Sequence, residues 1–156
     1  MSRRSIVPVL VFLLASTATA GAARTGEIEV RDGSSGVPCF TVPEREERRG
    51  GAPNFQSIVV VEAGRANAVM WKMAMPATRS FPVSFRMCIP YAGRLPVLPQ
   101  TPAAPLRPGR SYEVTIAAEP ATRGGPRSYR ARFCVSGEAG ALKVGGTAGT
   151  GRGCGR

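Results

Sequence analysis

Short runs in which apolar and polar residues alternate restrict this chain to a β architecture. The clearest runs lie at residues 55–63, 68–75, 112–117 and 129–135, separated by glycines, prolines and polar clusters. Alternation with period two places successive side chains on opposite faces of a half-buried strand. No stretch of eleven or more residues shows a convincing helical period. The sequence therefore predicts an all-β fold.

Three further runs bring the predicted strand count to about seven. They cover residues 27–31, 37–42 and 81–89. The charged segment 43–54 is predicted to be a solvated loop, and segment 90–110 a stiff connection, because its six prolines disfavour both a ladder strand and a helix. Seven antiparallel strands fit an immunoglobulin-like sandwich. A small β-barrel is the alternative, since a strand count does not separate the two.

The end of segment 90–110 resembles a known structural corner. Leu106, the pair Pro108 and Gly109, and Tyr112 at the start of an alternating strand are similar to the corner before the penultimate strand of fibronectin type III and related immunoglobulin-like sandwiches. The resemblance implies that the Tyr112 hydroxyl bonds back to upstream backbone.

Residues 1–20 have the three parts of a secretory signal peptide. Arg3 and Arg4 give a positive start, an apolar run follows, and small residues form a cleavage site. The apolar run is about ten residues long, whereas a bilayer span needs roughly twenty. No cysteine lies where a lipoprotein would be acylated. We therefore expect a periplasmic or secreted protein without lipid and without a stable membrane anchor.

The remainder is predicted to form one β domain over residues 21–144. About 135 residues is an ordinary size for a single domain. Residues 145–156 are rich in glycine and have little to bury, so we expect a flexible tail.

Four cysteines in an oxidising compartment allow three disulfide pairings. In an immunoglobulin-like strand order the second and fifth strands are antiparallel neighbours, which favours Cys39 with Cys88 and leaves Cys134 with Cys154. Both Cys39 and Cys88 are expected to point outward, because apolar neighbours occupy the inner faces. Pairing Cys88 with Cys134 and Cys39 with Cys154 needs a different strand order and stays open.

Arginines on the outer faces of two predicted strands form a candidate basic surface. Alternation in run 81–89 places Arg86 outward, and alternation in run 129–135 does the same for Arg130 and Arg132. A solvated face is the alternative interpretation. In run 81–89 the residues expected to face the core are Phe81, Val83, Phe85 and Met87.

The chain lacks the residues on which most hydrolytic chemistry depends. It has no histidine, and its one aspartate, Asp32, lies in a predicted turn. A Ser-His-Asp triad, a Cys-His pair and histidine metal sites are thereby excluded, and no Cys-x-x-Cys spacing supports a metal site. We expect a non-enzymatic protein with no metal and no cofactor.

The net charge of +11 favours an acidic partner or an anionic polymer. No RNP-like, zinc-finger or helix-turn-helix pattern accompanies the arginines, so we expect no nucleic-acid partner. Only two of the 21 basic residues are lysine, a bias that a GC-rich genome also produces.

A series of short motifs resembles a family of small exported proteins and lipoproteins of proteobacteria. Most members are uncharacterised, and some are labelled periplasmic immunity proteins of type VI secretion systems. The chain departs from the family in lacking the lipoprotein cysteine and in carrying the Cys154 tail. The motifs are Pro38-Cys39-Phe40, Trp71, Cys88-Ile89-Pro90-Tyr91, Leu106 with Tyr112-x-Val-x-Ile116, and Tyr129-x-Ala-x-Phe-Cys134.

The resemblance implies an exported, non-enzymatic periplasmic binding protein, in its specific form an immunity protein that sequesters an envelope-targeted toxin. The expected partner is then a protein of the envelope. The alternative is a structural or accessory envelope protein that binds anionic polymers through its basic surface.

Overall fold

The computed structural model describes residues 24–33, 36–64, 68–93, 98–138 and 141–145. The predicted signal peptide, residues 1–20, lies outside the described residues, and so does the predicted tail except for Gly145.

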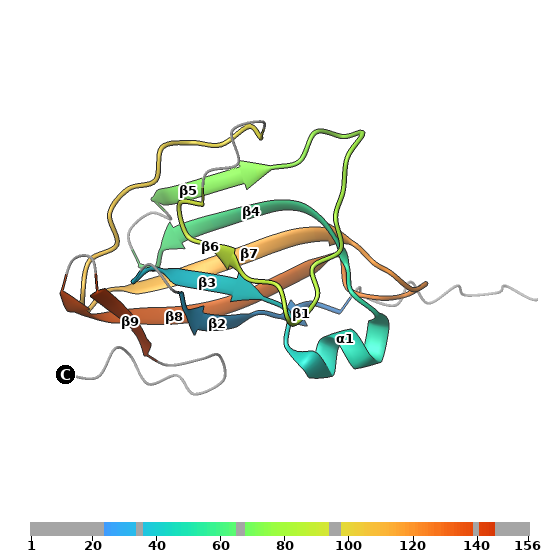
Figure 1. The fold of residues 1–156 in the computed structure, drawn as a ribbon, viewed down its shortest axis with the longest axis horizontal. Coiled ribbons are helices and arrows are strands. Elements are labelled where there is room, and N and C mark those ends of the chain that lie inside the picture. Colours follow the sequence, from blue (N-terminus) through green and yellow to red (C-terminus); the bar gives the residue numbers. More distant parts are fainter. Residues whose placement is uncertain (1–23, 34–35, 65–67, 94–97, 139–140, 146–156) are drawn as a thin grey trace, which may run out of the picture.

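Nearly all regular structure in the described part of the chain is β, arranged in two sheets (Figure 1). The larger sheet has the order β1-β8-β7-β4-β5, with β9 on the same edge of β8 as β1; the smaller sheet has the order β2-β3-β6. All pairings are antiparallel except that of β1 with β8. The elements are β1 (Gly26–Glu27), β2 (Glu29–Asp32), β3 (Pro38–Thr41), α1 (Glu44–Gly50), β4 (Asn54–Glu62), β5 (Val69–Ala74), β6 (Ile89–Pro90), β7 (Ser111–Glu119), β8 (Ser128–Glu138) and β9 (Ala141–Gly145).

The described strands form a sandwich and not a closed barrel, which confirms the predicted fold class. The fourth predicted strand, β5, pairs with β4 in the larger sheet, the place that an additional strand takes in variable-type immunoglobulin domains. Strand β9 was not predicted. It pairs with β8 and also approaches β2, where Asp32 accepts a hydrogen bond of 2.6 Å from the Val144 N–H.

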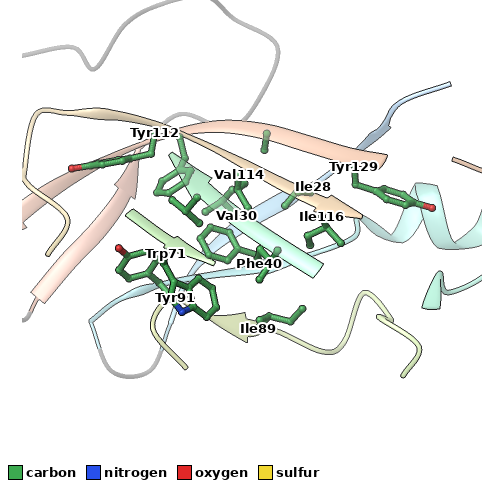
Figure 2. Close-up of a cluster of buried hydrophobic side chains, with 14 of the residues drawn as sticks. Ile28, Val30, Phe40, Trp71, Ile89, Tyr91, Tyr112, Val114, Ile116 and Tyr129 are labelled. Carbon is green, nitrogen blue, oxygen red and sulfur yellow. The ribbon is translucent and has the colours of Figure 1, made fainter. Parts of the chain in front are cut away.

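The core lies between the inner faces of the two sheets (Figure 2). Strands β7 and β8 alternate as the sequence predicts, with every second side chain buried. Phe40 on β3 reaches across the sandwich to Phe133 on β8, with ring centroids 5.5 Å apart. The largest fully buried side chains include Trp71, Tyr112, Phe40, Phe55 and Phe133.

Segment 43–54 contains a helix, so the prediction that it is only a solvated loop was wrong. Helix α1 is seven residues long, too short to show a period in the sequence. Glutamates occupy its first turn and arginines its last turn, an order that complements the helix dipole. One of these glutamates, Glu46, is buried, with 4% of its surface exposed.

Run 81–89 forms a strand only at its end, so the prediction of a full strand was also wrong. Ile89 and Pro90 pair with β3, and Pro82 makes an isolated bridge to β4. Val83 is buried as expected, but Met87 is 42% exposed. The Met87 N–H donates a 3.0 Å hydrogen bond to the Ser84 carbonyl, so the backbone turns where the alternation suggested extended chain.

The proline-rich connection runs beside β5 and supplies acceptors and donors to its edge. Ala74 donates to the Pro99 carbonyl, and Thr101 and Ala104 donate to carbonyls of β5, over 2.8–3.0 Å. The Tyr91 hydroxyl contacts the Ala104 carbonyl at 2.5 Å. Burial raises the pKa of Tyr91. Covering an edge strand with a proline-rich segment prevents its pairing with another chain.

The structure contains the tyrosine corner that the fibronectin resemblance implies. The Tyr112 hydroxyl accepts a 2.7 Å hydrogen bond from the Arg107 N–H and lies 3.4 Å from the Arg107 carbonyl. Leu106 is buried beside it. Gly109 has a φ of +75°, which favours glycine, and its N–H donates to the Val135 carbonyl.

The start of the described chain is fixed to α1 by an ion pair. Both terminal nitrogens of Arg24 donate to the Glu46 carboxylate over 2.8 Å. These hydrogen bonds hold the pKa of the Glu46 carboxyl below its ordinary value, against the opposing effect of burial. The pair links the segment that leads into β1 to the helix.

We predict that Tyr112→Phe lowers the free energy of unfolding by about 1 kcal/mol, because it removes the hydroxyl that bonds to the Arg107 backbone. Urea unfolding at equilibrium measures the change. Arg107→Ala is the matched control: it keeps the backbone partner and should change stability by less than about 0.5 kcal/mol. Equal losses in the two variants would contradict a stabilising role for the hydroxyl.

We predict that Arg24→Ala lowers the free energy of unfolding by about 1–3 kcal/mol at neutral pH, because it leaves the Glu46 carboxylate buried without its main partner. The folded-state pKa of Glu46 is lowered, so the pair stabilises the fold above the ordinary pKa of 4.5. This contribution is lost as pH falls through the folded-state pKa.

Urea unfolding of wild type and Arg24→Ala at several pH values measures this difference, which should be full at neutral pH and shrink in acid. Arg48→Ala breaks an exposed pair with Glu44 and should cost no more than about 0.5 kcal/mol. A difference for Arg24→Ala that stays constant down to strongly acidic pH would contradict the assignment.

Candidate functional site

The three predicted surface arginines do not lie on one surface. Arg130 and Arg132 point outward from β8 in the larger sheet and are exposed, as predicted. Arg86 lies in the turn after Ser84, whose backbone is bound by β2, β3 and α1 on the side of the smaller sheet. The candidate basic surface therefore divides into two separate candidate surfaces.

The first is the outer face of the larger sheet, which we define by Lys72, Val59, Thr115, Arg130 and Arg132. The strand register places Lys72 opposite Val59, Val59 opposite Thr115, and Thr115 opposite Arg130. Three strand spacings separate the backbones of Lys72 and Arg130, or about 14 Å. Long cationic side chains thus stand at both sides of a row whose centre holds short side chains.

Small side chains fill the middle of this outer face. Val59 and Thr115 are partly exposed, as are their neighbours Ser57, Val61 and Ala117 on the same face. Short side chains let another surface approach the sheet closely, and the rigid ladder beneath them costs little entropy on binding.

The charges on the outer face are unequally neutralised. Arg132 lies 3.2 Å from the Glu113 carboxylate on β7. For Lys72 and Arg130, no acidic side chain within the described ranges comes within ion-pair distance. Glu27 on β1 is the register partner of Arg130 on its other side, but the Glu27 carboxylate pairs with Arg45. The two ends of the row therefore keep positive charge that a partner can neutralise.

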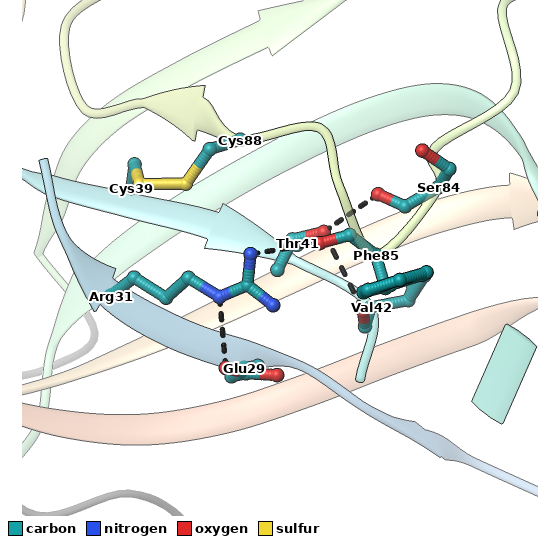
Figure 3. The surroundings of a disulfide bond; sticks show 8 residues. All are labelled: Glu29, Arg31, Cys39, Thr41, Val42, Ser84, Phe85 and Cys88. Atoms are coloured by element: carbon teal, nitrogen blue, oxygen red, sulfur yellow. Dashed lines mark hydrogen bonds and ion pairs between the residues drawn. A yellow bond between two sulfur atoms is a disulfide. The ribbon is translucent and has the colours of Figure 1, made fainter. Parts of the chain in front are cut away.

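The second candidate surface is the turn formed by residues 84–88, which we call the clamped turn (Figure 3). The Phe85 N–H donates a 2.6 Å hydrogen bond to the Glu47 carboxylate of α1. Arg31 on β2 donates to the Phe85 carbonyl over 2.8 Å, and the buried Thr41 hydroxyl donates to the Ser84 carbonyl over 2.9 Å. Three different elements therefore hold the backbone of two adjacent residues.

Further contacts fix the groups that hold the turn. The Arg31 guanidinium donates to Glu29 over 2.8 Å, and this hydrogen bond lowers the pKa of the Glu29 carboxyl. A disulfide joins Cys88 at the end of the turn to Cys39 on β3, with the two Cα atoms 5.4 Å apart. This is the pair that the strand order favours. Cys39 is buried but is not part of the hydrophobic core cluster to which its neighbour Phe40 belongs, and Cys88 is partly exposed.

The side chains at the tip of the clamped turn are presented to solvent. Arg86 and Met87 are exposed, and Phe85 is partly exposed. The Arg86 guanidinium lies over the Phe85 ring, 5.4 Å from its centroid. The turn was not predicted, because Ser84 and Arg86 alternate with apolar residues as in a strand. The prolines at positions 82 and 90 were the signal against a ladder strand.

The described residues contain no group of three histidine, cysteine, aspartate or glutamate side chains that could hold a metal ion. They also form no helix with the length and apolar character required to cross a bilayer. Cys134 is disulfide-bonded, and its predicted partner Cys154 lies outside the described residues, so that pairing stays a prediction.

Comparisons with known proteins assign no family to the chain. No family model, no curated protein and no solved structure matches it. The two sequence resemblances therefore rest on short motifs, and any functional proposal depends on the geometry of the outer face and the clamped turn.

Proposed function

We propose that this chain is an exported, non-enzymatic binding protein that uses the outer face of the larger sheet to contact a protein with an acidic surface. The row from Lys72 through Val59 and Thr115 to Arg130 carries this proposal. Its centre is made of short side chains, and its ends are cationic. Complementary charge would steer an acidic partner to the face and fix its orientation.

The distribution of acidic groups supports an acidic partner. Most described glutamates are engaged within the molecule, so the excess positive charge of the chain resides on the remaining cations. When the acidic side chains of a protein are already paired within the molecule, its unpaired cations attract negatively charged partners. The ion-paired glutamates are Glu27, Glu29, Glu44, Glu46, Glu62 and Glu113.

The proposed compartment is the periplasm or the extracellular space, reached by a cleaved signal peptide and without lipid. A disulfide between β3 and the clamped turn fits an oxidising compartment. In this setting the specific form of the function is immunity: the protein would sequester a toxin that reaches the envelope, and the toxin would supply the acidic surface.

A second candidate function is binding of an anionic envelope polymer. Exposed cations outside the outer face favour it, because a polymer can contact several faces at once. Among the described residues these cations include Arg79, Arg86, Arg107, Arg123 and Arg127. Polymer binding would depend on total charge, whereas a protein interface depends on the position of each charge.

We predict that the double variant Lys72→Glu with Arg130→Glu reduces recovery of the partner from an envelope extract by about tenfold, because like charges would then oppose an acidic surface. Immobilised mature protein is incubated with the extract, and bound proteins are measured by quantitative mass spectrometry. The double variant Arg79→Glu with Arg107→Glu has the same change in net charge in loops away from the face, and should alter recovery less than about twofold.

The two variants distinguish the candidate functions. Equal losses, with binding that weakens steeply as salt increases, would favour the anionic polymer and overturn the protein interface. If neither double variant alters recovery of the partner, the described cations do not bind it, and both candidate functions are rejected for these cations.

A further inference from the structure

We propose that the clamped turn is a second, independent recognition element that inserts into an apolar pocket of a partner protein carrying a carboxylate at its rim. This inference goes beyond the proposed function, because the turn is bound to β2, β3 and α1 and lies on the side of the smaller sheet. It does not depend on the outer face having a partner.

The backbone of the turn is held more firmly than a surface loop requires. Both the N–H and the carbonyl of Phe85 bond to charged side chains, from Glu47 and Arg31. The Ser84 carbonyl accepts from both the Thr41 hydroxyl and the Met87 N–H. A peptide segment fixed in one conformation loses little entropy on binding, which raises its affinity for a matching pocket.

A purely structural role explains the backbone contacts but not the side chains at the tip. The contacts replace the ladder hydrogen bonds that this run would make as a strand, and a polar residue at position 87 would serve that purpose equally well. Met87 is instead one of two large apolar side chains that are clearly exposed in the described part of the chain. The preceding residue, Arg86, places its guanidinium over the Phe85 ring.

The side-chain chemistry defines the partner. The exposed Met87 side chain would fill an apolar cavity. Methionine adapts to an irregular cavity because its side chain is unbranched and flexible. Arg86 has no ion pair with an acid within the described residues. A carboxylate beside that cavity would pair with its guanidinium. An arginine next to an apolar anchor is typical of the few residues that dominate binding energy at protein interfaces.

A lipid surface is the other class of partner that an apolar and cationic tip could meet. Stable attachment to a membrane takes a long apolar face, two lipid chains, or one chain with a polybasic patch. The clamped turn supplies one well-exposed apolar side chain and one cation, so the observations favour a protein pocket.

Site-specific crosslinking tests the proposal. Met87 is replaced by the photoreactive residue benzoylphenylalanine in the full mature protein, which is irradiated in envelope extract. Val69 on β5, the other large apolar side chain that is clearly exposed in the described part of the chain, lies opposite Val61 beside the outer face. It receives the same probe, so that contact through the turn is separated from contact through the outer face. We expect a discrete protein adduct from position 87 that position 69 does not give, with its crosslinked peptide identified by mass spectrometry and lying beside an acidic residue.

Four further substitutions in the position-87 probe protein test the mechanism. Arg86→Glu and Glu47→Ala should each reduce the adduct at least about fivefold, by removing the cation and by loosening the turn. Glu44→Ala changes an acid on the same helix that does not contact the turn and should leave the adduct unchanged. Lys72→Glu should also leave it unchanged, which separates this site from the outer face.

Arg86→Glu is decisive if Glu47→Ala unfolds the protein, because Arg86 is exposed and its substitution leaves the backbone contacts intact. No discrete adduct at position 87, an identical adduct at position 69, or an adduct insensitive to Arg86→Glu would overturn the proposal. So would flotation with phosphatidylglycerol vesicles that Met87→Ser abolishes, since that result would assign the turn to a membrane.

Discussion

The packing of Phe40 against Phe133 is the contact on which the two-layer structure depends. Phe40 lies on the central strand of the smaller sheet, is fully buried, and pairs through its backbone with Val30 on β2 and Ile89 on β6. Phe133 occupies the inner face of β8 and also lies 5.5 Å from the Tyr112 ring. Because β3 is flanked by only short strands, its place over the larger sheet is set mainly by this burial of aromatic surface.

The predictable part of the fold is the part where each strand has two neighbours. Strands β4 and β7 have neighbours on both edges, and their alternating residues bury one face, so the period in the sequence equals the period of burial. The same holds for β8, where Tyr129 and Phe133 are buried while Arg130 and Arg132 are exposed.

The sequence alone could not show that run 81–89 does not form a full strand, because the side chains that bind its backbone lie far away in the sequence. Residues 83–88 have no strand on which to pair, and their backbone groups bond to side chains 38 to 54 positions away, from Glu47, Thr41 and Arg31. The burial of Glu46 has a similar cause, since its partner Arg24 lies 22 residues earlier. For the candidate site, the sequence identified the outward arginines but not that Arg86 lies apart from Arg130.

Net charge at the level of the sequence likewise says little about where a partner binds. Glu113 and Arg132 face each other across β7 and β8, so this arginine is partly neutralised although it is 77% exposed. Arg130, two residues away on the same face, lies between the uncharged Thr115 on β7 and Glu27 on β1, whose carboxylate pairs with Arg45. The pairing of the neighbouring acids, and not the number of arginines, therefore determines which cations remain available. Because the clamped turn is fixed by other contacts on the other layer, the two surfaces can be altered separately.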